Sequence, residues 1–221
     1  MPLALIRSFL IEYFQIWTIP KAIRTDNGLP FGVPSRDVVP IMSLWLKAWG
    51  IIPILNRPRR PTDNAKVERA QGTTSRWAEV NKCANLNILQ QQLDEVCCLQ
   101  REKYLVTRLG NVTRARLHLS LQAKPRPFEE AVFDEEMAYN HLSKMVMARK
   151  VAENGLIVIY DKTFSIGVAH KRKTAFIKAS PEAPQWTVFD EKGNVLKILQ
   201  DPRFNRENLF NLTCQRTILK N

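Results

Sequence analysis

Residues 21–28 read Lys-Ala-Ile-Arg-Thr-Asp-Asn-Gly, a short extended segment that ends in a turn signal. Upstream of it, apolar residues recur at helical spacing and predict a helix over residues 3–17. Downstream, Asp37 suits the N-cap of a helix that ends at Trp49, and the apolar residues 51–55 are typical of a buried parallel strand. This alternation of helix and strand predicts an α/β fold.

The composition indicates a globular protein with a polyanionic partner. The chain has 33 Lys and Arg against 21 Asp and Glu, a net charge of +12, and 45% of its 221 residues are hydrophobic. An excess of this size, spread evenly over both halves, points to nucleic acid. No apolar run reaches the roughly 18 residues that suggest a membrane span. The 4 cysteines lack metal-ligand spacing, which fits a reducing cytoplasm.

The remainder of the chain changes character along its length. A basic, Pro-bounded loop over residues 56–61 is followed by predicted helices over residues 64–82 and 86–105. Residues 111–127 have the composition of a linker, and residues 128–149 are predicted to be a helix. Beyond them, five short strands suggest a small barrel: 151–160, 163–169, 174–179, 185–189 and 194–199. The expected parts are therefore an α/β core over 1–110, a basic linker and helix over 111–150, a β-barrel over 151–200 and a tail over 201–221.

Two acids stand out by their position. Asp26 lies where a strand runs into a turn, at the carboxyl end where ligands gather in an open α/β sheet. Glu68 lies on the helix that follows the next strand, so the two carboxylates share an edge if the strands are neighbours. Such oxygen ligands would suit Mg²⁺ or Mn²⁺. Each acid also has a structural alternative: Asp26 can serve only its turn or cap the next helix, and Glu68 can be a solvated member of an ion pair.

Three runs of sequence carry a resemblance to a known family. They are residues 23–31 (Ile-Arg-Thr-Asp-Asn-Gly-x-x-Phe), Trp45 with the Gly-Ile pair at 50–51, and residues 58–69, which end in Asn-Ala-Lys-Val-Glu-Arg. Together they resemble the integrase core of insertion-sequence transposases and retroviral integrases. The resemblance implies an RNase H-like sheet with an Asp-Asp-Glu triad, in which Asp26 is the second acid and Glu68 the third. An intact triad would hold two Mg²⁺ or Mn²⁺ ions for DNA cleavage and strand transfer.

The first acid of that triad has no counterpart here. Residues 1–25 contain no Asp, and their only acid, Glu12, lies in the middle of the predicted helix. The chain is therefore expected to begin inside the fold, without the opening β-hairpin, and the strand over residues 21–25 would be an unpaired edge beside exposed apolar surface. We expect such a truncated copy to have little or no activity, and Mg²⁺-dependent strand transfer to be absent from the isolated chain.

Basic and polar side chains near the third acid are candidates for holding the DNA backbone. Asn64 would orient Glu68 or contact DNA. The expected phosphate contacts are Arg57, Arg59, Arg60, Lys66, Arg69 and Arg76.

The last part has a resemblance of its own. Residues 151–193, with Trp186 and Gly193 among the matched positions, resemble the small, SH3-like C-terminal β-barrel of phage Mu-type transposases. The resemblance implies contact with DNA or with other subunits. The basic run Lys171-Arg172-Lys173 is the candidate DNA contact, with a solvated hairpin end as the alternative, and Trp186 either stacks on a partner or packs in the core.

Two functional hypotheses follow. The first is DNA transposition or integration by a DDE-class enzyme, acting on transposon ends and target DNA as a homo-oligomer in the bacterial cytoplasm, at the nucleoid. The second is a non-catalytic DNA-binding or assembly module whose working part is residues 111–221, with the two acids as relics. An RNase H-like nuclease is a weaker third possibility.

Overall fold

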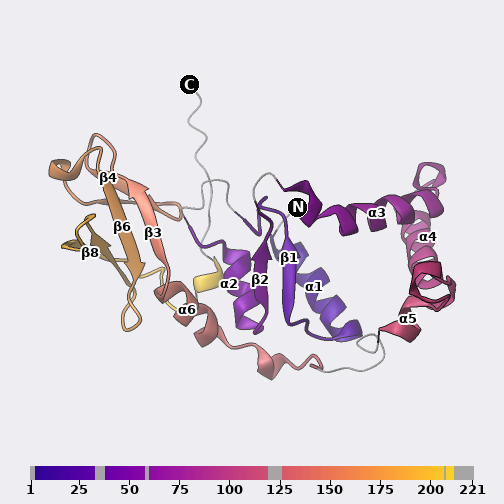
Figure 1. The fold of residues 1–221 in the computed structure, drawn as a ribbon. Helices are drawn as coiled ribbons and strands as arrows, with labels where there is room; N and C mark the ends of the chain where they lie inside the picture. The colour runs from indigo at the N-terminus through magenta and orange to yellow at the C-terminus, as the bar shows by residue number, and fades with distance from the viewer. Residues whose placement is uncertain (1–2, 33–37, 58–59, 119–125, 207, 212–221) are drawn as a thin grey trace. The chain divides into compact units, whose positions relative to one another are not determined.

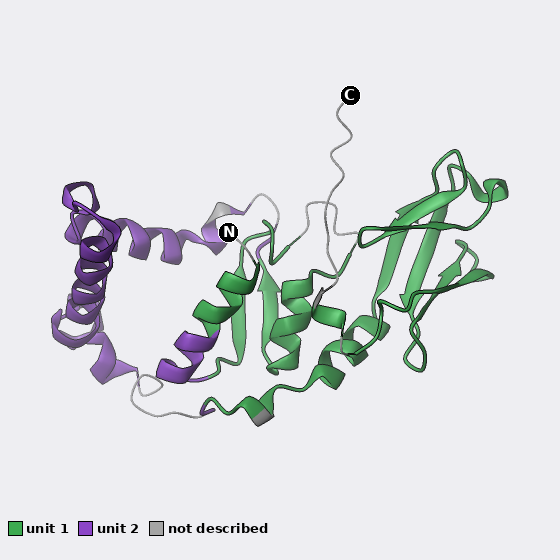
Figure 2. Cartoon of the chain, turned by 180° about the vertical axis from the view of Figure 1, so that it is seen from behind, with its two compact units in different colours: residues 1–10, 19–55, 128–221 green, residues 11–18, 56–127 purple. Residues whose placement is uncertain are grey.

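The computed structural model describes residues 3–32, 38–57, 60–118, 126–206 and 208–211 (Figure 1). The chain forms two compact units (Figure 2): unit 1 comprises residues 1–10, 19–55 and 128–221, and unit 2 comprises residues 11–18 and 56–127. The structure is mixed α/β with open sheets, which confirms the predicted class. Within the described ranges, each helix is too short or too polar to cross a membrane.

The N-terminal elements reproduce the predicted alternation of helix and strand. They are α1 (Leu3–Trp17), β1 (Ala22–Thr25), α2 (Ile41–Ala48) and β2 (Ile52–Leu55). β1 and β2 pair in parallel, with Ala22 opposite Ile52 and Thr25 opposite Leu55. The parallel strand predicted over residues 51–55 is therefore found, and the condition that it neighbours the strand before Asp26 is met.

Helix α2 is buried on all sides. Each of its residues except Lys47 is buried, and a helix that is apolar all round needs cover all round. That cover comes from α6 (Glu135–Ser143), from β2 and from the 3₁₀ helix η8 (Leu209–Asn211), and α2 shares one apolar core with the C-terminal strands. The helix begins after Pro40, and Gly50, with a φ of +65°, follows its end as predicted. The predicted N-cap, Asp37, lies outside the described residues.

The β1–β2 pair is more exposed than predicted. The side chains of Ile52 and Leu55 are 54% and 36% exposed, so the prediction of a fully buried strand is wrong. The physical reason is that the described pair is only two strands wide and both of its edges are open. The open edge of β1 agrees with the expected unpaired strand, and α1 also exposes apolar side chains: Leu5, Phe9, Tyr13 and Ile16.

Unit 2 is helical. Its elements are η1 (Pro61–Asp63), α3 (Ala65–Trp77), η2 (Val80–Lys82), α4 (Leu86–Cys98), the π-helical turn η3 (Leu99–Lys103), η4 (Thr107–Leu109) and α5 (Arg114–Leu117). The central parts of both predicted helices are confirmed. α3 ends early because Glu79 adopts a left-handed φ of +44°. The side chain of Asn85 caps α4 by accepting from the backbone N–H of Ile88 (3.0 Å).

In its described residues, the C-terminal half of unit 1 contains η6 (Glu130–Val132), α6 and six strands. The strands are β3 (Val146–Lys150), β4 (Leu156–Ile159), β5 (Lys162–Ser165), β6 (Thr174–Ala179), β7 (Gln185–Phe189) and β8 (Val195–Gln200), with η7 (Val168–His170) before β6 and η8 (Leu209–Asn211) after β8. They form a four-stranded antiparallel sheet in the order β3-β6-β7-β8 and a β4–β5 hairpin.

Two expectations about this half need correction. The predicted helix over residues 128–149 is too long at both ends. At its start, residues 130–132 form η6 and Asp134 caps α6, and at its end residues 146–150 pair with β6, which overrides the local helical pattern. The predicted strand over residues 151–160 is divided as well, because Gly155, at a φ of +74°, makes a turn before β4.

One apolar core joins α2, α6 and both C-terminal sheets of unit 1. Trp186 is fully buried, which confirms the core alternative for this residue, and its ring lies 4.2 Å from that of Phe204 between centroids. Phe204 and Leu209 are also fully buried, although they fall in the predicted tail. The core thus combines segments from both ends of the chain, so unit 1 does not follow the predicted division at residues 110 and 150.

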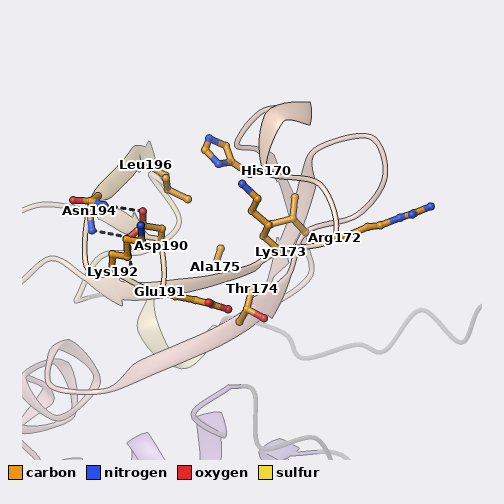
Figure 3. Close-up of a pocket in the computed structure, with 11 residues that line it drawn as sticks. His170, Arg172, Lys173, Thr174, Ala175, Asp190, Glu191, Lys192, Asn194 and Leu196 are labelled. Atoms are coloured by element: carbon orange, nitrogen blue, oxygen red, sulfur yellow. Dashed lines mark hydrogen bonds between the residues drawn. The ribbon is translucent and has the colours of Figure 1, made fainter.

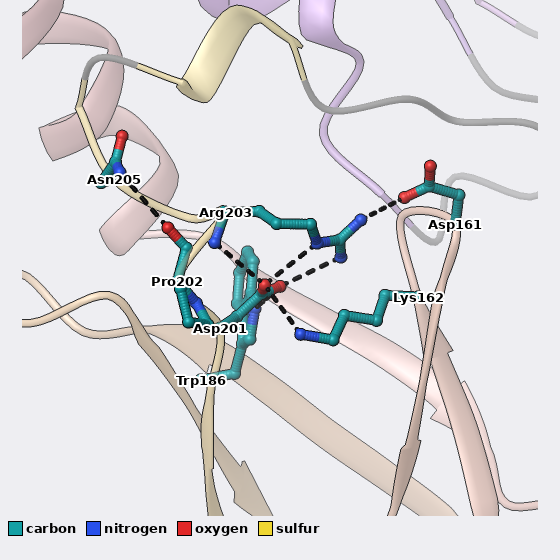
Figure 4. A network of polar contacts seen from close by, with 7 residues as sticks. All are labelled: Asp161, Lys162, Trp186, Asp201, Pro202, Arg203 and Asn205. Carbon is teal, nitrogen blue, oxygen red and sulfur yellow. Dashed lines mark hydrogen bonds and ion pairs between the residues drawn. The ribbon is translucent and has the colours of Figure 1, made fainter.

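Asp201, directly after β8, is a buried carboxylate with several donors (Figure 4). It accepts from Nε1 of Trp186 (3.2 Å) and from Nε and Nη2 of Arg203 (both 3.1 Å), and the ammonium of Lys162 lies 3.4 Å away. Arg203 also pairs with Asp161 (2.7 Å). The network links β7, the β4–β5 hairpin and the segment after β8.

Candidate nucleic-acid interface

Asp26 lies where the sequence predicts it, directly after β1 at the carboxyl end of a parallel pair. Its side chain is exposed, and Oδ1 accepts from the backbone N–H of Gly28 (3.2 Å). This hydrogen bond stabilises the turn itself, as expected if Asp26 has only a structural role. Within the described chain Oδ2 has no hydrogen bond or ion pair, so one carboxylate oxygen is available to a ligand.

Glu68 lies in the first turn of α3 and is also exposed. No cation pairs with it among the described residues, so the ion-pair alternative is not observed there. A carboxylate in the first helical turn is favoured by the helix dipole, which is enough to explain its presence without a ligand.

Asp26 and Glu68 are considered separately as possible metal ligands, because they belong to different units. Each is an exposed carboxylate without a cationic partner in the described chain, which is the chemistry that Mg²⁺ requires. Asp26 belongs to unit 1 and Glu68 to unit 2. In the described ranges, the structure contains no cluster of three or more His, Cys, Asp or Glu able to hold a metal. Their joint role as ligands therefore stays a prediction from the sequence.

Hydrogen bonds from side chains of the loop between β2 and α3 connect the start of this loop to its end. Nε and Nη2 of Arg57 donate to the carboxylate of Asp63 (3.1 and 2.6 Å), and the Arg57 backbone N–H donates to the same group (2.9 Å). The Asn56 side chain donates to Oδ1 of Asn64 (2.7 Å). Asn64 thus contacts Asn56 rather than Glu68 through its side chain, and a phosphate bound by Arg57 would compete with Asp63.

Arg60 is exposed in this loop, whereas Arg59 lies outside the described residues. Residues 56–127 as a whole contain fourteen Lys and Arg against six Asp and Glu, a net charge of +8.

Helix α3 has no buried residue. Lys66, Arg69 and Arg76 are all exposed, and their spacing places them within a sector of about 80° around the helix axis. Thr73, in the same sector, donates its hydroxyl hydrogen bond to the carbonyl of Arg69 (2.9 Å). We call Lys66, Arg69 and Arg76 the α3 basic face. By the same geometry, Glu68 lies outside this face, about 100° from Arg69.

The basic run at residues 171–173 lies between η7 and β6, beside a cavity of about 550 Å³ (Figure 3). Lys173, His170 and Lys192 line this cavity, whereas Lys171 does not. Arg172 extends away from the β7–β8 turn and forms an ion pair with Glu153. Within the run, Arg172 and Lys173 line the cavity and Lys171 does not, and of the two lining cations Arg172 is the one with the ion pair to Glu153.

The carboxylate of Asp190, across the cavity, is occupied by its own turn. Oδ1 accepts from the backbone N–H groups of Lys192 (2.9 Å) and Asn194 (2.8 Å), and Oδ2 from the Asn194 side chain (2.9 Å). These hydrogen bonds, with those from Asn194 as the largest contribution, hold the pKa of Asp190 below its ordinary value. The sequence did not single out His170 or Lys192, because the turn that brings Lys192 here follows β7, away from the basic run.

Sequence reasoning also gave no role to a group of aromatic and cationic side chains in unit 2. Trp77 and Tyr104 form an edge-to-face pair with centroids 5.1 Å apart, and Arg114 lies over Tyr104 at 5.9 Å. The signal available in the sequence was the placement of exposed aromatics among basic residues, but nothing in it shows that α3 and the π-helical turn bring these rings together.

Comparison with known proteins supplies no relative for this chain. No protein-family model matches it, and no curated protein matches it.

Proposed function

We propose that this chain binds duplex DNA through the α3 basic face, as a protein of the DDE class of transposases and integrases. The observation that carries the DNA-binding part is a helix with no buried side chain and three exposed cations on one side. A helix without an apolar face contributes little to a core, so another role must account for it.

The charge around the helix supports the same partner. With a net charge of +8 over residues 56–127, unit 2 attracts a polyanion over its whole length. Arg57 is held by Asp63 in the same loop, so the α3 basic face rather than Arg57 is the main phosphate contact in this proposal.

The assignment to the DDE class rests on the sequence motifs, with Asp26 at the end of a strand and Glu68 in the first turn of α3 as its second and third acids. In an intact Asp-Asp-Glu triad, Mg²⁺ or Mn²⁺ would supply charge neutralisation for phosphodiester cleavage and strand transfer, whereas this chain lacks the first acid. The resemblance implies that each carboxylate would be a metal ligand, and in this proposal the α3 basic face holds the DNA.

The test measures the affinity of the full chain for a DNA duplex as a function of salt. Replacing Lys66, Arg69 and Arg76 together by Ala removes three phosphate contacts, so we expect the slope of log K against log salt to fall by about 2–3. The matched control replaces the exposed Lys144, Lys150 and Lys178 by Ala, which removes the same charge. Equal losses in both variants would show that only net charge matters and would overturn the proposal.

The non-catalytic alternative is favoured by a separate observation, the cavity beside Lys173. If the C-terminal sheets provide the DNA contact, Lys173→Ala combined with Lys192→Ala in the full chain lowers duplex affinity more than the α3 variant does. Lys171→Ala is the control, because Lys171 belongs to the same basic run, two residues before Lys173, but does not line the cavity.

A further inference from the structure

Unit 2 carries partly exposed aromatic rings between cations. The side chains of Trp77 and Tyr104 are 38% and 46% exposed, and they touch edge to face. The guanidinium of Arg114 lies over the Tyr104 ring, and that of Arg101 lies 4.4 Å from the centroid of Trp17. We call Trp77, Tyr104 and Arg114 the aromatic platform.

Hydrogen bonds fix the platform in place. The π-helical turn η3 brings Tyr104 back toward the helix, with its backbone N–H donating to the carbonyl of Leu99 (2.8 Å). Gln100 in the same turn donates to the hydroxyl of Thr74 on α3 (3.2 Å), and Arg114 donates to the carbonyl of Gln100 (2.7 Å). These hydrogen bonds connect three segments of unit 2 around the two rings. The rings are therefore already ordered before a ligand binds, and binding costs less conformational entropy of the protein.

The charges next to the platform favour an anion. Arg76 precedes Trp77 in the chain, Lys103 precedes Tyr104, and Arg108 follows one turn later; all three are exposed. The acids in these stretches have cations of their own, since Glu102 pairs with Arg101 (2.6 Å) and Glu79 with Lys82 (2.7 Å). Among the described residues these three cations have no ion-pair partner, and exposed rings beside such cations suit a ligand that has flat apolar faces and negative charge.

We propose that the aromatic platform stacks the unpaired bases of single-stranded nucleic acid. Unpaired bases offer such faces and are linked by phosphates, whereas the faces of bases in a duplex are covered by their neighbours. The proposal deepens the nucleic-acid binding proposed above by adding a second substrate form, at a surface that adjoins the α3 basic face at Arg76.

The test compares a single-stranded oligonucleotide with a duplex of the same sequence, both binding to the full chain. Tyr104→Ala weakens single-strand binding about tenfold, within the range of one lost stacking contact, and leaves duplex binding within about twofold. Tyr104→Phe keeps the ring and retains the affinity. Tyr13→Ala is the matched control, because Tyr13 is an exposed tyrosine on α1 outside the platform.

A second probe separates stacking from charge. An oligonucleotide of abasic nucleotides keeps the phosphates and lacks the bases, so it binds the unaltered protein about as weakly as the normal strand binds Tyr104→Ala. If normal and abasic strands bind equally, or if Tyr13→Ala weakens binding as much as Tyr104→Ala does, the stacking proposal is wrong. Duplex binding that depends on the α3 basic face would still stand in that case. Conversely, Tyr104-dependent single-strand binding without duplex binding would refute only the earlier proposal.

Discussion

The carboxylate of Asp201 shows how one residue stabilises the C-terminal half of unit 1. Burial alone would raise the pKa of this group, but the hydrogen bonds from Arg203 and Trp186 and the charges of Arg203 and Lys162 outweigh burial and lower it. Because the folded-state pKa lies below that of the unfolded chain, the ionised carboxylate stabilises the fold above the unfolded value. This contribution disappears as the pH falls through the folded value.

Asp201→Asn removes that contribution. We expect the free energy of unfolding at neutral pH to fall by about 1–3 kcal/mol, because Trp186 loses a charged acceptor while Lys162 and Arg203 are exposed enough to be solvated. Urea unfolding measured from neutral pH to about pH 3 checks this, and the loss should shrink toward the acid end. Asp94→Asn, on the exposed surface of α4, is the control. A loss that stays constant across this pH range would contradict the electrostatic explanation.

Residue roles were predictable from the sequence where the signal is local. The turn at Asp26 and the first-turn position of Glu68 follow from a few neighbouring residues, and both are found in the structure. The ligand set of Asp201 was not predictable, because Lys162 and Trp186 lie on strands that only the fold brings to it. The pairing of Arg57 with Asp63 was missed because charge alone does not show which cations already have a partner.

Among the elements, α3 depends on its own helical propensity. It lacks a buried face, and its centre contains Gly72, at which an added Cβ would meet no atom within 4 Å. The helix is therefore held mainly by backbone hydrogen bonds and local contacts, and its amide protons should exchange faster than those of the buried α2.

Gly72→Ala should stabilise unit 2. Alanine is favoured over glycine inside a helix by about 0.5–1 kcal/mol, and the added methyl group meets no obstacle here. Hydrogen exchange of the α3 amides measures this directly. Gly155→Ala is the opposite case, because its φ is +74° and the new Cβ would lie 2.4 Å from the backbone of Gly167; we expect a loss of at least about 2 kcal/mol. Faster exchange in Gly72→Ala would refute the propensity argument.

Element boundaries were predictable where caps or glycines mark them. Periodicity gave α1 and the centres of α3 and α4, and Gly50 marked the end of α2. The strand β3 was not predicted, because its partner β6 lies well downstream in the chain. Residues 146–150 have a local helical pattern, but in the folded chain they pair with β6 as a strand.

At the scale of the whole molecule, the core of unit 1 is built from distant segments. Residues 39–48 pack with residues 138–209, so the N-terminal and C-terminal halves of the sequence are not separate structures. The expectation of a core, linker, barrel and tail in sequence order rested on composition, which does not report contacts between segments this far apart.

Separate expression of residues 1–110 and 111–221 tests this organisation. The first fragment leaves α2 without the cover that buries Ile41, Leu44 and Ala48, and the second leaves a gap where α2 packs. We expect each fragment to aggregate or to lack a cooperative unfolding transition, and mixing them during refolding to restore one. Circular dichroism and gel filtration provide the measurements. A cooperative transition in either fragment alone would argue for the predicted boundaries instead.

The burial of α2 has a consequence for synthesis on the ribosome. Residues 41–48 leave the exit tunnel about 80 residues before Phe128, the start of the segment that covers them. At a synthesis rate of about 5–20 residues per second, this apolar helix stays exposed for roughly 4–16 s before the segment that covers it emerges. During that interval the exposed apolar helix favours aggregation, so shielding of nascent apolar segments by chaperones should raise the yield of native protein.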